Sequence, residues 1–98
     1  SAYNAANFAV DGFTQALSKE VGEHAITVNS VCPGLTETSR LDPMGRTGRW
    51  DARIVEIPLL RAGSDEEVGE LIGFLCSPRA GYITGQSLNI NGGVITER

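Results

Sequence analysis

The chain has 98 residues, of which 41% are apolar and 20% are charged, an ordinary balance for a globular protein. Its net charge of −4 argues against a nucleic-acid-binding protein, because such proteins gather Lys and Arg on one surface. No apolar run approaches the roughly 18 residues that a membrane span needs. No basic segment precedes an apolar stretch in the manner of a secretory signal. We therefore expect neither a nucleic-acid partner nor a membrane partner.

Residues 2–21 have the pattern of an amphipathic helix. Polar side chains such as Asp11 and Ser18 fall mostly off its apolar face. Gly12 lowers helix propensity by about 1 kcal/mol relative to Ala, so we expect another element to approach closely there. Gly22 is the expected end of the helix. The apolar residues that recur at helical spacing, and that we expect to face the core, are Ala6, Ala9, Val10, Phe13, Leu17 and Val21.

The remaining elements follow in the order strand, long loop, helix, strand. Residues 26–32 are β-branched and precede Pro33-Gly34, which predicts a buried strand. The pattern is irregular over residues 35–60, apart from a short helix at about 50–56. Ser64-Asp-Glu-Glu67 has the form of a capping box and predicts a helix that ends before Pro78. A last strand is predicted at residues 87–91.

This order of elements is typical of one half of a doubly wound α/β domain. Two strands are too few for a parallel sheet, which needs helices on both faces. The chain also begins inside a predicted helix and without an initiator Met. We therefore expect residues 1–98 to form a single partial domain, with two strands and two main helices, that belongs to a longer protein.

The two cysteines have no spacing that would bind a metal. Cys32 and Cys76 lie far apart, each beside apolar residues, and we expect both to be small buried hydrophobes. A disulfide or a reactive thiol is the alternative. Unpaired cysteines fit a reducing, cytoplasmic location.

Tyr3 is followed four residues later by Asn7, a spacing that places both on one face of the first helix. Residues 28–34 end in Pro-Gly, residues 82–86 read Tyr-Ile-Thr-Gly-Gln, and residues 91–93 read Asn-Gly-Gly. In this order and spacing, the sequence resembles the carboxyl-terminal portion of the short-chain dehydrogenase/reductase family. The resemblance implies an α/β fold, the carboxyl-terminal half of a Rossmann-type doubly wound parallel sheet.

The family motif is Tyr-x-x-x-Lys, and here the lysine is Asn7. The resemblance implies that Tyr3 is the catalytic acid and base that exchanges a proton with the substrate oxygen. The family's lysine binds the nicotinamide ribose, and its charge stabilises the phenolate. Asparagine can hydrogen-bond but carries no charge. A degraded site, a specialised site and an error in the sequence all remain open.

The resemblance also implies an NAD or NADP cofactor, with Tyr3, Asn7, Pro33, Gly34, Thr36 and Thr38 as the binding residues. It implies a small-molecule alcohol or ketone substrate and a homo-oligomer, either a dimer or a tetramer. The family's glycine-rich dinucleotide loop and the serine upstream of the tyrosine do not occur in the 98 residues. The alternative hypothesis is therefore a catalytically silent scaffold or oligomerisation piece of the same fold.

Three further features have a possible structural role as well as a possible functional one. His24 lies where a cation complements the dipole at the end of the first helix. Trp50 is placed to line a substrate pocket or to anchor a subunit contact. Arginines gathered across the long loop fit either an anionic or carrier-bound substrate or a solvated, partly ion-paired surface; they are Arg40, Arg46, Arg49, Arg53 and Arg61.

Overall fold

A computed structural model describes residues 2–37 and 52–94 of the chain. The contacts divide these residues into two compact units. The first unit contains the described residues up to Val31 together with residues 72–88. The second contains the described residues of 32–71 and 89–97. Among the described residues, no helix combines the length and the hydropathy that crossing a membrane requires.

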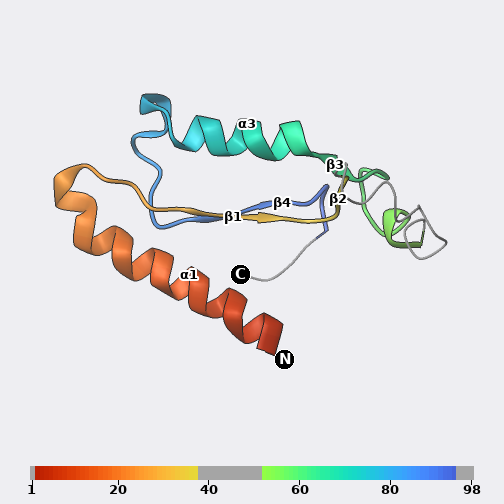
Figure 1. Ribbon diagram of the computed structural model, residues 1–98, viewed down its shortest axis with the longest axis horizontal. Helices are drawn as coiled ribbons and strands as arrows, with labels where there is room; N and C mark the ends of the chain where they lie inside the picture. The colour runs from red at the N-terminus through yellow and green to blue at the C-terminus, as the bar shows by residue number, and fades with distance from the viewer. Residues whose placement is uncertain (1, 38–51, 95–98) are drawn as a thin grey trace. The chain divides into compact units, whose positions relative to one another are not determined.

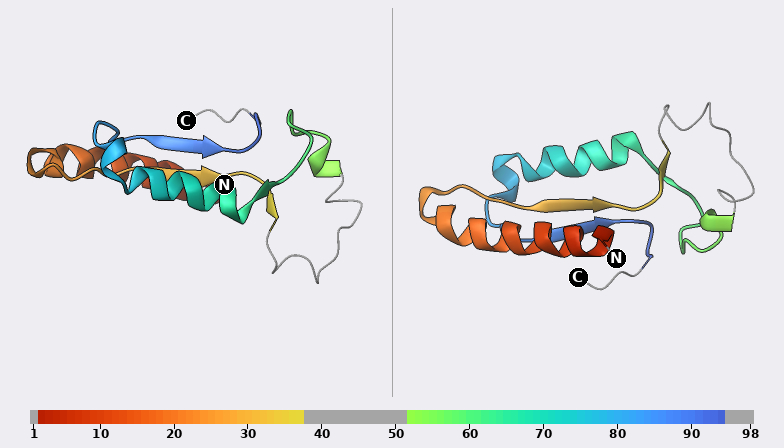
Figure 2. Two further views of the ribbon diagram at one scale, coloured as in Figure 1. Left: turned by 90° about the horizontal axis from the view of Figure 1, so that it is seen from above. Right: turned by 60° about the horizontal axis from the view of Figure 1, so that its bottom comes forward.

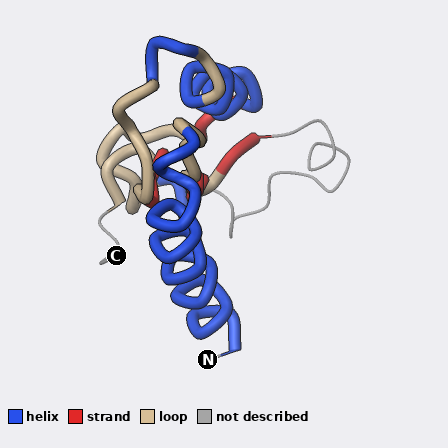
Figure 3. Tube along the Cα trace, turned by 90° about the vertical axis from the view of Figure 1, so that its left-hand side faces the viewer, coloured by secondary structure: helices blue, strands red, loops and turns tan. Residues whose placement is uncertain are grey.

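The first unit begins with α1 (Ala2–Val21), which confirms the predicted helix (Figures 1 and 3). A 3₁₀ turn, η1 (Gly22–His24), follows directly, so the α-helix does end at Gly22. The residue with left-handed backbone is Ala25 (φ 60°), and its N–H donates to the Gly22 carbonyl at 3.0 Å. His24 is exposed and lies 3.6 Å from Glu23, as expected for a solvated side chain.

The strands β1 (Ser30–Pro33) and β4 (Ser87–Ile90) are neighbours in one sheet (Figures 1 and 2). In the first unit the Ser30 N–H donates to the Gln86 carbonyl at 2.9 Å. In the second unit the Gly34 N–H donates to the Ile90 carbonyl at 2.9 Å. The partners are 56 residues apart in both bonds (86 − 30 and 90 − 34), a constant offset that marks a parallel pair.

β1 begins four residues later than the sequence predicts. The Val28 N–H donates to the Thr84 hydroxyl at 3.0 Å, so a side chain accepts the bond that a neighbouring strand would otherwise accept. The carboxyl-terminal strand was predicted at residues 87–91 and is present as β4 at Ser87–Ile90.

The second unit contains a short parallel pair that the sequence does not predict. β2 (Thr36–Glu37) pairs with β3 (Gly63–Ser64), with Thr36 opposite Gly63. Two-residue strands show no alternation of side chains, so periodicity gives no signal for them. The chain thus has two strands more than predicted. Residues 52–54 are helical and fall within the short helix expected at about 50–56.

The capping box at the start of α3 (Asp65–Leu75) is confirmed. The Glu67 N–H donates to Ser64 Oγ at 3.2 Å, and the Ser64 N–H donates to Glu67 Oε1 at 2.9 Å. Arg61 donates to both Glu67 carboxylate oxygens, each at 2.8 Å. The Arg61 hydrogen bond, followed by that from the Ser64 backbone, holds the pKa of Glu67 at about 2, below its usual value.

The buried stripe of α1 is polar. The prediction that the apolar stripe faces the core is wrong for the four members that are exposed, and the other two, Leu17 and Val21, are half-buried. Its buried residues are Asp11, Thr14 and Ser18, whereas Phe13 is 66% exposed. Each buried polar side chain has a partner: Asp11 accepts from Ser87, and Thr14 and Ser18 donate to carbonyls of their own helix. These hydrogen bonds offset the cost of burial, so a polar stripe can pack inward.

Two smaller predictions are also wrong. A Cβ added at Gly12 would meet nothing within 4 Å, so no described element approaches that glycine closely. Cys76 is exposed and Cys32 is only partly buried, because few side chains in the described residues cover them. Ile57 and Ala80 are the apolar residues that are buried among those described.

Candidate functional site

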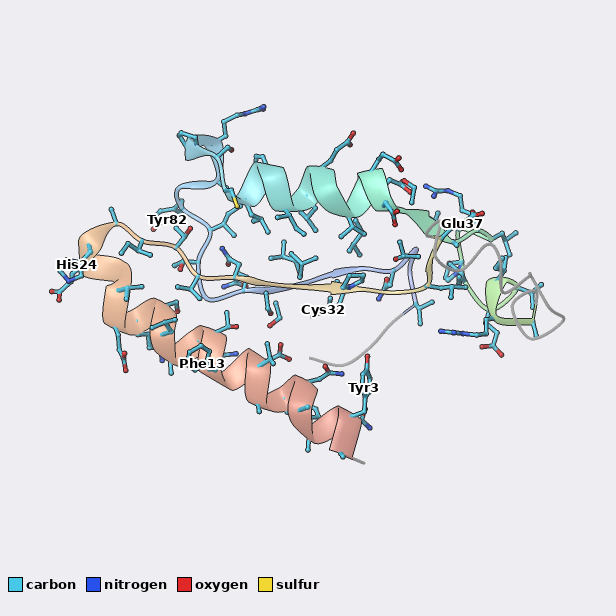
Figure 4. The ribbon with its side chains drawn as sticks, in the orientation of Figure 1. Tyr3, Phe13, His24, Cys32, Glu37 and Tyr82 are labelled. Atoms are coloured by element: carbon cyan, nitrogen blue, oxygen red, sulfur yellow. The ribbon has the colours of Figure 1, made fainter. Side chains whose placement is uncertain are left out.

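The predicted catalytic pair lies on α1 in the first unit. Tyr3 is on the first turn of the helix and is 74% exposed (Figure 4). Asn7 lies one turn further along the same face and is half-buried. Asp11, a further turn along, is buried, so the three residues form one stripe that passes from solvent into the unit. The structure therefore gives the two residues the shared face that the sequence predicts.

The chemistry of this stripe differs from that of a charged pair. The Tyr3 phenol can donate or accept a proton at its oxygen. The Asn7 amide can donate and accept hydrogen bonds, but it supplies no positive charge to stabilise a phenolate. The pair can thus hydrogen-bond a ligand and exchange a proton with it, but no positive charge like that of a lysine stabilises the phenolate.

The predicted cofactor-binding residues belong to the second unit, apart from Tyr3 and Asn7. Pro33 ends β1, and Thr36 lies in β2, where its hydroxyl donates to the Gly34 carbonyl at 3.1 Å. That bond leaves the Thr36 oxygen able to accept a hydrogen bond. Thr38 lies outside the described residues. The structure therefore brings Gly34 and Thr36 together.

Gly34 lies against Asn91 within the second unit. A Cβ added at Gly34 would lie 2.7 Å from the Asn91 Cβ and 2.9 Å from its Cα, closer than side chains approach. The Asn91 side chain accepts from the Gly93 N–H at 3.1 Å and donates to the Val94 carbonyl. The Pro-Gly and Asn-Gly-Gly motifs, far apart in sequence, are therefore one packed feature in which only glycine fits at position 34.

The two glycines after Asn91 hold the segment at residues 57–59. Gly92 and Gly93 have positive φ (70° and 101°), a conformation that favours glycine. A Cβ at Gly92 would lie 2.6 Å from Ile57 Cγ2, and one at Gly93 would lie 3.0 Å from Pro58. The Leu59 N–H also donates to the Gly92 carbonyl at 3.1 Å. Small residues here allow the segment after the long loop to pack directly on backbone.

In the first unit, Asn29 binds the segment at residues 83–86. Its amide donates to the Ile83 carbonyl at 3.0 Å, and its Oδ1 accepts from the Gln86 N–H at 3.1 Å. The Gly85 N–H donates to the Val28 carbonyl at 2.7 Å. These bonds join residues 28–29 to residues 83–86, so the Val-Asn and Thr-Gly-Gln motifs lie side by side. They also fix the position of the segment that leads into β4.

Sequence reasoning missed a hydrogen-bonded chain of three side chains in the first unit. Ser30 Oγ donates to Ser87 Oγ at 2.9 Å, and Ser87 Oγ donates to Asp11 Oδ1 at 2.7 Å. Asp11 and Ser87 are 76 residues apart, and local periodicity gives no sign of such a contact. An acidic residue on the polar side of an amphipathic helix is normally predicted to be solvated. Asp11 is buried instead, because Ser87 donates a hydrogen bond to it.

Two further features bear on possible ligands. An open groove in the first unit is lined by residues from 25–31 and 72–81, and none of the predicted site residues lines it. In the part of the chain that the structure describes, no group of three or more His, Cys, Asp or Glu side chains gathers as a metal site would. The predicted site residues therefore form two separate groups, the α1 stripe in the first unit and the loop after β1 in the second.

Comparisons with known proteins agree with these motifs. A family model described as enoyl-(acyl carrier protein) reductase matches residues 1–95. The chain is 44% identical over 92 residues to a 3-oxoacyl-(acyl-carrier-protein) reductase of Pseudomonas aeruginosa, covering 94% of this chain and 37% of the relative. It is 39% identical over 92 residues to the reductase of the same name from Vibrio cholerae, with the same coverage.

Solved structures give the same result. A Thermus thermophilus protein superposes with a TM-score of 0.83 at 35% identity, covering 94% of this chain and 39% of that one. A variant of a Serratia marcescens short-chain dehydrogenase/reductase superposes with a TM-score of 0.78 at 37% identity, covering 87% of this chain and 34% of that one. The chain thus has the α/β fold of these proteins and spans little more than a third of their length.

Proposed function

Because this chain belongs to the short-chain dehydrogenase/reductase family, we propose that it is the carboxyl-terminal part of an NAD(P)-dependent oxidoreductase. Residues 1–98 would form one partial domain of that protein. The observation that carries the proposal is the Tyr3–Asn7 stripe on α1, in a chain that also holds the Pro-Gly and Asn-Gly-Gly motifs. The names of its relatives make a carrier-bound 3-oxoacyl group the first substrate to test.

The residues described here fit the nicotinamide end of a dinucleotide. Gly34 presents backbone without a Cβ, and the Thr36 oxygen retains the capacity to accept a hydrogen bond from a carboxamide. Asn7 would hydrogen-bond a ribose hydroxyl through its amide. When bound, the nicotinamide supplies or accepts the hydride. A glycine-rich phosphate loop does not occur in the 98 residues, so this chain offers no phosphate site of that kind.

Tyr3 handles the proton in this reaction. In the direction of reduction, its phenol gives a proton to the substrate oxygen as the carbonyl carbon gains the hydride, and water returns the proton to the phenolate. In the direction of oxidation, the phenolate removes the proton from the alcohol. Proton transfer by a positioned side chain is typically worth about 10²–10⁴ in rate. Asn7 leaves the phenolate without a neighbouring charge, so we expect slow turnover at neutral pH.

The test compares four forms of the complete protein, using oxidation of NADPH or NADH by a 3-oxoacyl thioester. Tyr3→Phe removes the proton carrier but keeps the ring, so turnover should vanish while cofactor affinity, measured by fluorescence, stays nearly unchanged. Asn7→Lys should raise kcat by about 10²-fold or more because it restores the charge. Tyr82→Phe is the matched control, since Tyr82 is fully exposed in the same unit, and it should change nothing.

Two results would contradict the proposal. Equal turnover in Tyr3→Phe and the parent would show that Tyr3 is only a structural aromatic residue. Absence of turnover in both the parent and Asn7→Lys, with cofactor and substrate saturating, would favour the silent scaffold, for which the loss of the lysine is the supporting observation.

We also propose that the protein is cytoplasmic and assembles as a homodimer or homotetramer. Exposed aromatic residues on α1, Phe8 at 64% and Phe13 at 66%, support an assembled state because large apolar surfaces are rarely left in water. Light scattering of the complete protein after size exclusion measures the assembly, and a monomer at micromolar concentration would contradict this part of the proposal.

A further inference from the structure

The contacts of α1 are concentrated in its second half. Its buried residues are Asp11, Thr14 and Ser18, and the described residues of the helix before Asp11 are exposed or half-buried. Asp11 is therefore the buried residue nearest to Tyr3. Eight residues separate the two, a distance of about 12 Å along the axis at 1.5 Å per residue.

The three buried residues differ in what they bind. Thr14 Oγ1 donates to the Val10 carbonyl at 2.8 Å, and Ser18 Oγ donates to the Gln15 carbonyl at 2.7 Å, so both hydroxyls bond within α1. Asp11 instead accepts from Ser87 Oγ at 2.7 Å, and Ser87 is on β4. A hydrogen bond to a carboxylate is shorter and stronger than one between neutral groups.

A second hydroxyl continues this contact. Ser30 Oγ of β1 donates to Ser87 Oγ at 2.9 Å, so the Ser87 oxygen accepts from one strand while its hydrogen points to Asp11. Ser30 and Ser87 are themselves placed by the backbone bond from the Ser30 N–H to Gln86. The hydroxyl of Ser87 thus has a fixed direction, and the Asp11 carboxylate is held at one point over the strand pair.

We propose that Asp11 is a positioning residue for Tyr3, and that its hydrogen bond with Ser87 sets the angle at which α1 presents the phenol. The proposal rests on the function proposed above for Tyr3. With the anchor at Asp11, a tilt of about 5° displaces Tyr3 by about 1 Å over the 12 Å lever. A displacement of about 1 Å can cost roughly 10²-fold in rate. Without this bond the nearest buried anchor is Thr14, one turn further away.

Three variants of the complete protein test this assignment. Asp11→Leu and Ser87→Ala each remove the bond, and both should lower kcat by about 10-fold to 100-fold with little change in cofactor KM. Asp11→Asn keeps an oxygen that can accept from Ser87, so it should retain most of the activity. Thr14→Val is the matched control: Thr14 is buried on the same face but bonds only to Val10 among the described contacts, so kcat should stay within about twofold.

A second readout separates this inference from the proposed function. 3-Fluorotyrosine placed at position 3 reports its surroundings through its fluorine NMR signal, whether or not the protein turns over substrate. The signal should shift or broaden in Asp11→Leu and Ser87→Ala, and should match the parent in Asp11→Asn and Thr14→Val. The Asp11→Leu and Ser87→Ala effects should also add to less than their sum in the double variant, since both break the bond between Asp11 and Ser87.

The outcomes are distinct. If the fluorine signal is the same in the parent, Asp11→Leu and Ser87→Ala, Asp11 does not position Tyr3 and the inference is overturned, whatever the activity. If the signal moves as expected but Tyr3→Phe has parental turnover, the positioning stands and the proposed catalytic role of Tyr3 fails. If Thr14→Val loses kcat and moves the signal as much as Asp11→Leu, general packing of α1 explains the effect and the inference is overturned.

Discussion

Replacing Gly34 with Ala should destabilise the protein through one contact in the second unit. The new Cβ would lie 2.7 Å from the Asn91 Cβ, which is 0.7 Å inside the 3.4 Å at which ordinary contact begins. It would also lie 2.9 Å from the Asn91 Cα, so a change of side-chain rotamer cannot relieve the overlap. The backbone φ of Gly34 is not positive, so the cost is steric and not conformational.

Neither side of this contact can move freely. The Gly34 N–H donates to the Ile90 carbonyl, and Asn91 is bonded to both Gly93 and Val94. Overpacking of this kind typically costs about 1–3 kcal/mol. In a protein of 150–250 residues that corresponds to a fall in Tm of about 2–12 °C.

The assay is thermal unfolding of the complete protein, followed by circular dichroism. Gly69→Ala is the matched control, because a Cβ at Gly69 meets nothing within 4 Å and the residue is exposed inside α3, in the same unit as Gly34. That change should stabilise the protein by about 0.5–1 kcal/mol, so the two Gly→Ala variants should shift Tm in opposite directions. A Gly34→Ala protein that melts within about 1 °C of the parent would refute the packing argument.

Three other predictions concern stability. Ser64→Ala removes the N-cap of α3 and should cost about 1 kcal/mol in denaturant titrations; an unchanged midpoint would contradict the capping role. The pKa of Glu67 is lowered from 4.5 to about 2, so its stabilisation is complete above pH 4.5 and is lost as the pH falls toward 2. The difference in Tm between the parent and Glu67→Gln should therefore shrink over that range, and a constant difference would contradict the lowered pKa. The isolated 98-residue chain should show no cooperative melt as a dilute monomer, because Ile57 and Ala80 are the buried apolar residues among those described; such a melt in a demonstrably monomeric sample would contradict this.

The elements that the sequence predicts well are those with strong local signals. The bounds of α1, the capping box of α3 and the start of β4 were all predictable, because helical periodicity, a Ser-x-x-Glu spacing and a short alternation of polar and apolar residues act over a few residues. The same holds for the shared face of Tyr3 and Asn7, which follows from spacing alone. β2 and β3 were not predictable, since two residues carry no period.

The contacts that define the site were not predictable, for a different physical reason. The bond between Ser87 and Asp11 and the close approach of Gly34 to Asn91 each join residues that are more than 50 positions apart. At Asp11 the helical periodicity predicts exposure to solvent. The residue is buried instead, because the Ser87 hydroxyl of β4 donates a hydrogen bond to its carboxylate. A sequence shows which groups need partners, and the tertiary fold determines which partners they obtain.

The polar and apolar faces of α1 have different surroundings in this chain. The polar stripe faces the strand pair and is satisfied by hydrogen bonds, while Phe13 of the apolar stripe faces water. Covering that apolar stripe would stabilise the helix by about 25 cal/mol for each Å² removed from water. The chain spans little more than a third of its relatives, so polypeptide beyond these residues or a second copy can supply the cover. The angle of Tyr3 would then be set from both sides, by Asp11 on the polar face and by apolar packing on the other. The catalytic role that we propose for Tyr3 should therefore depend on assembly, and it is to be measured in the complete protein.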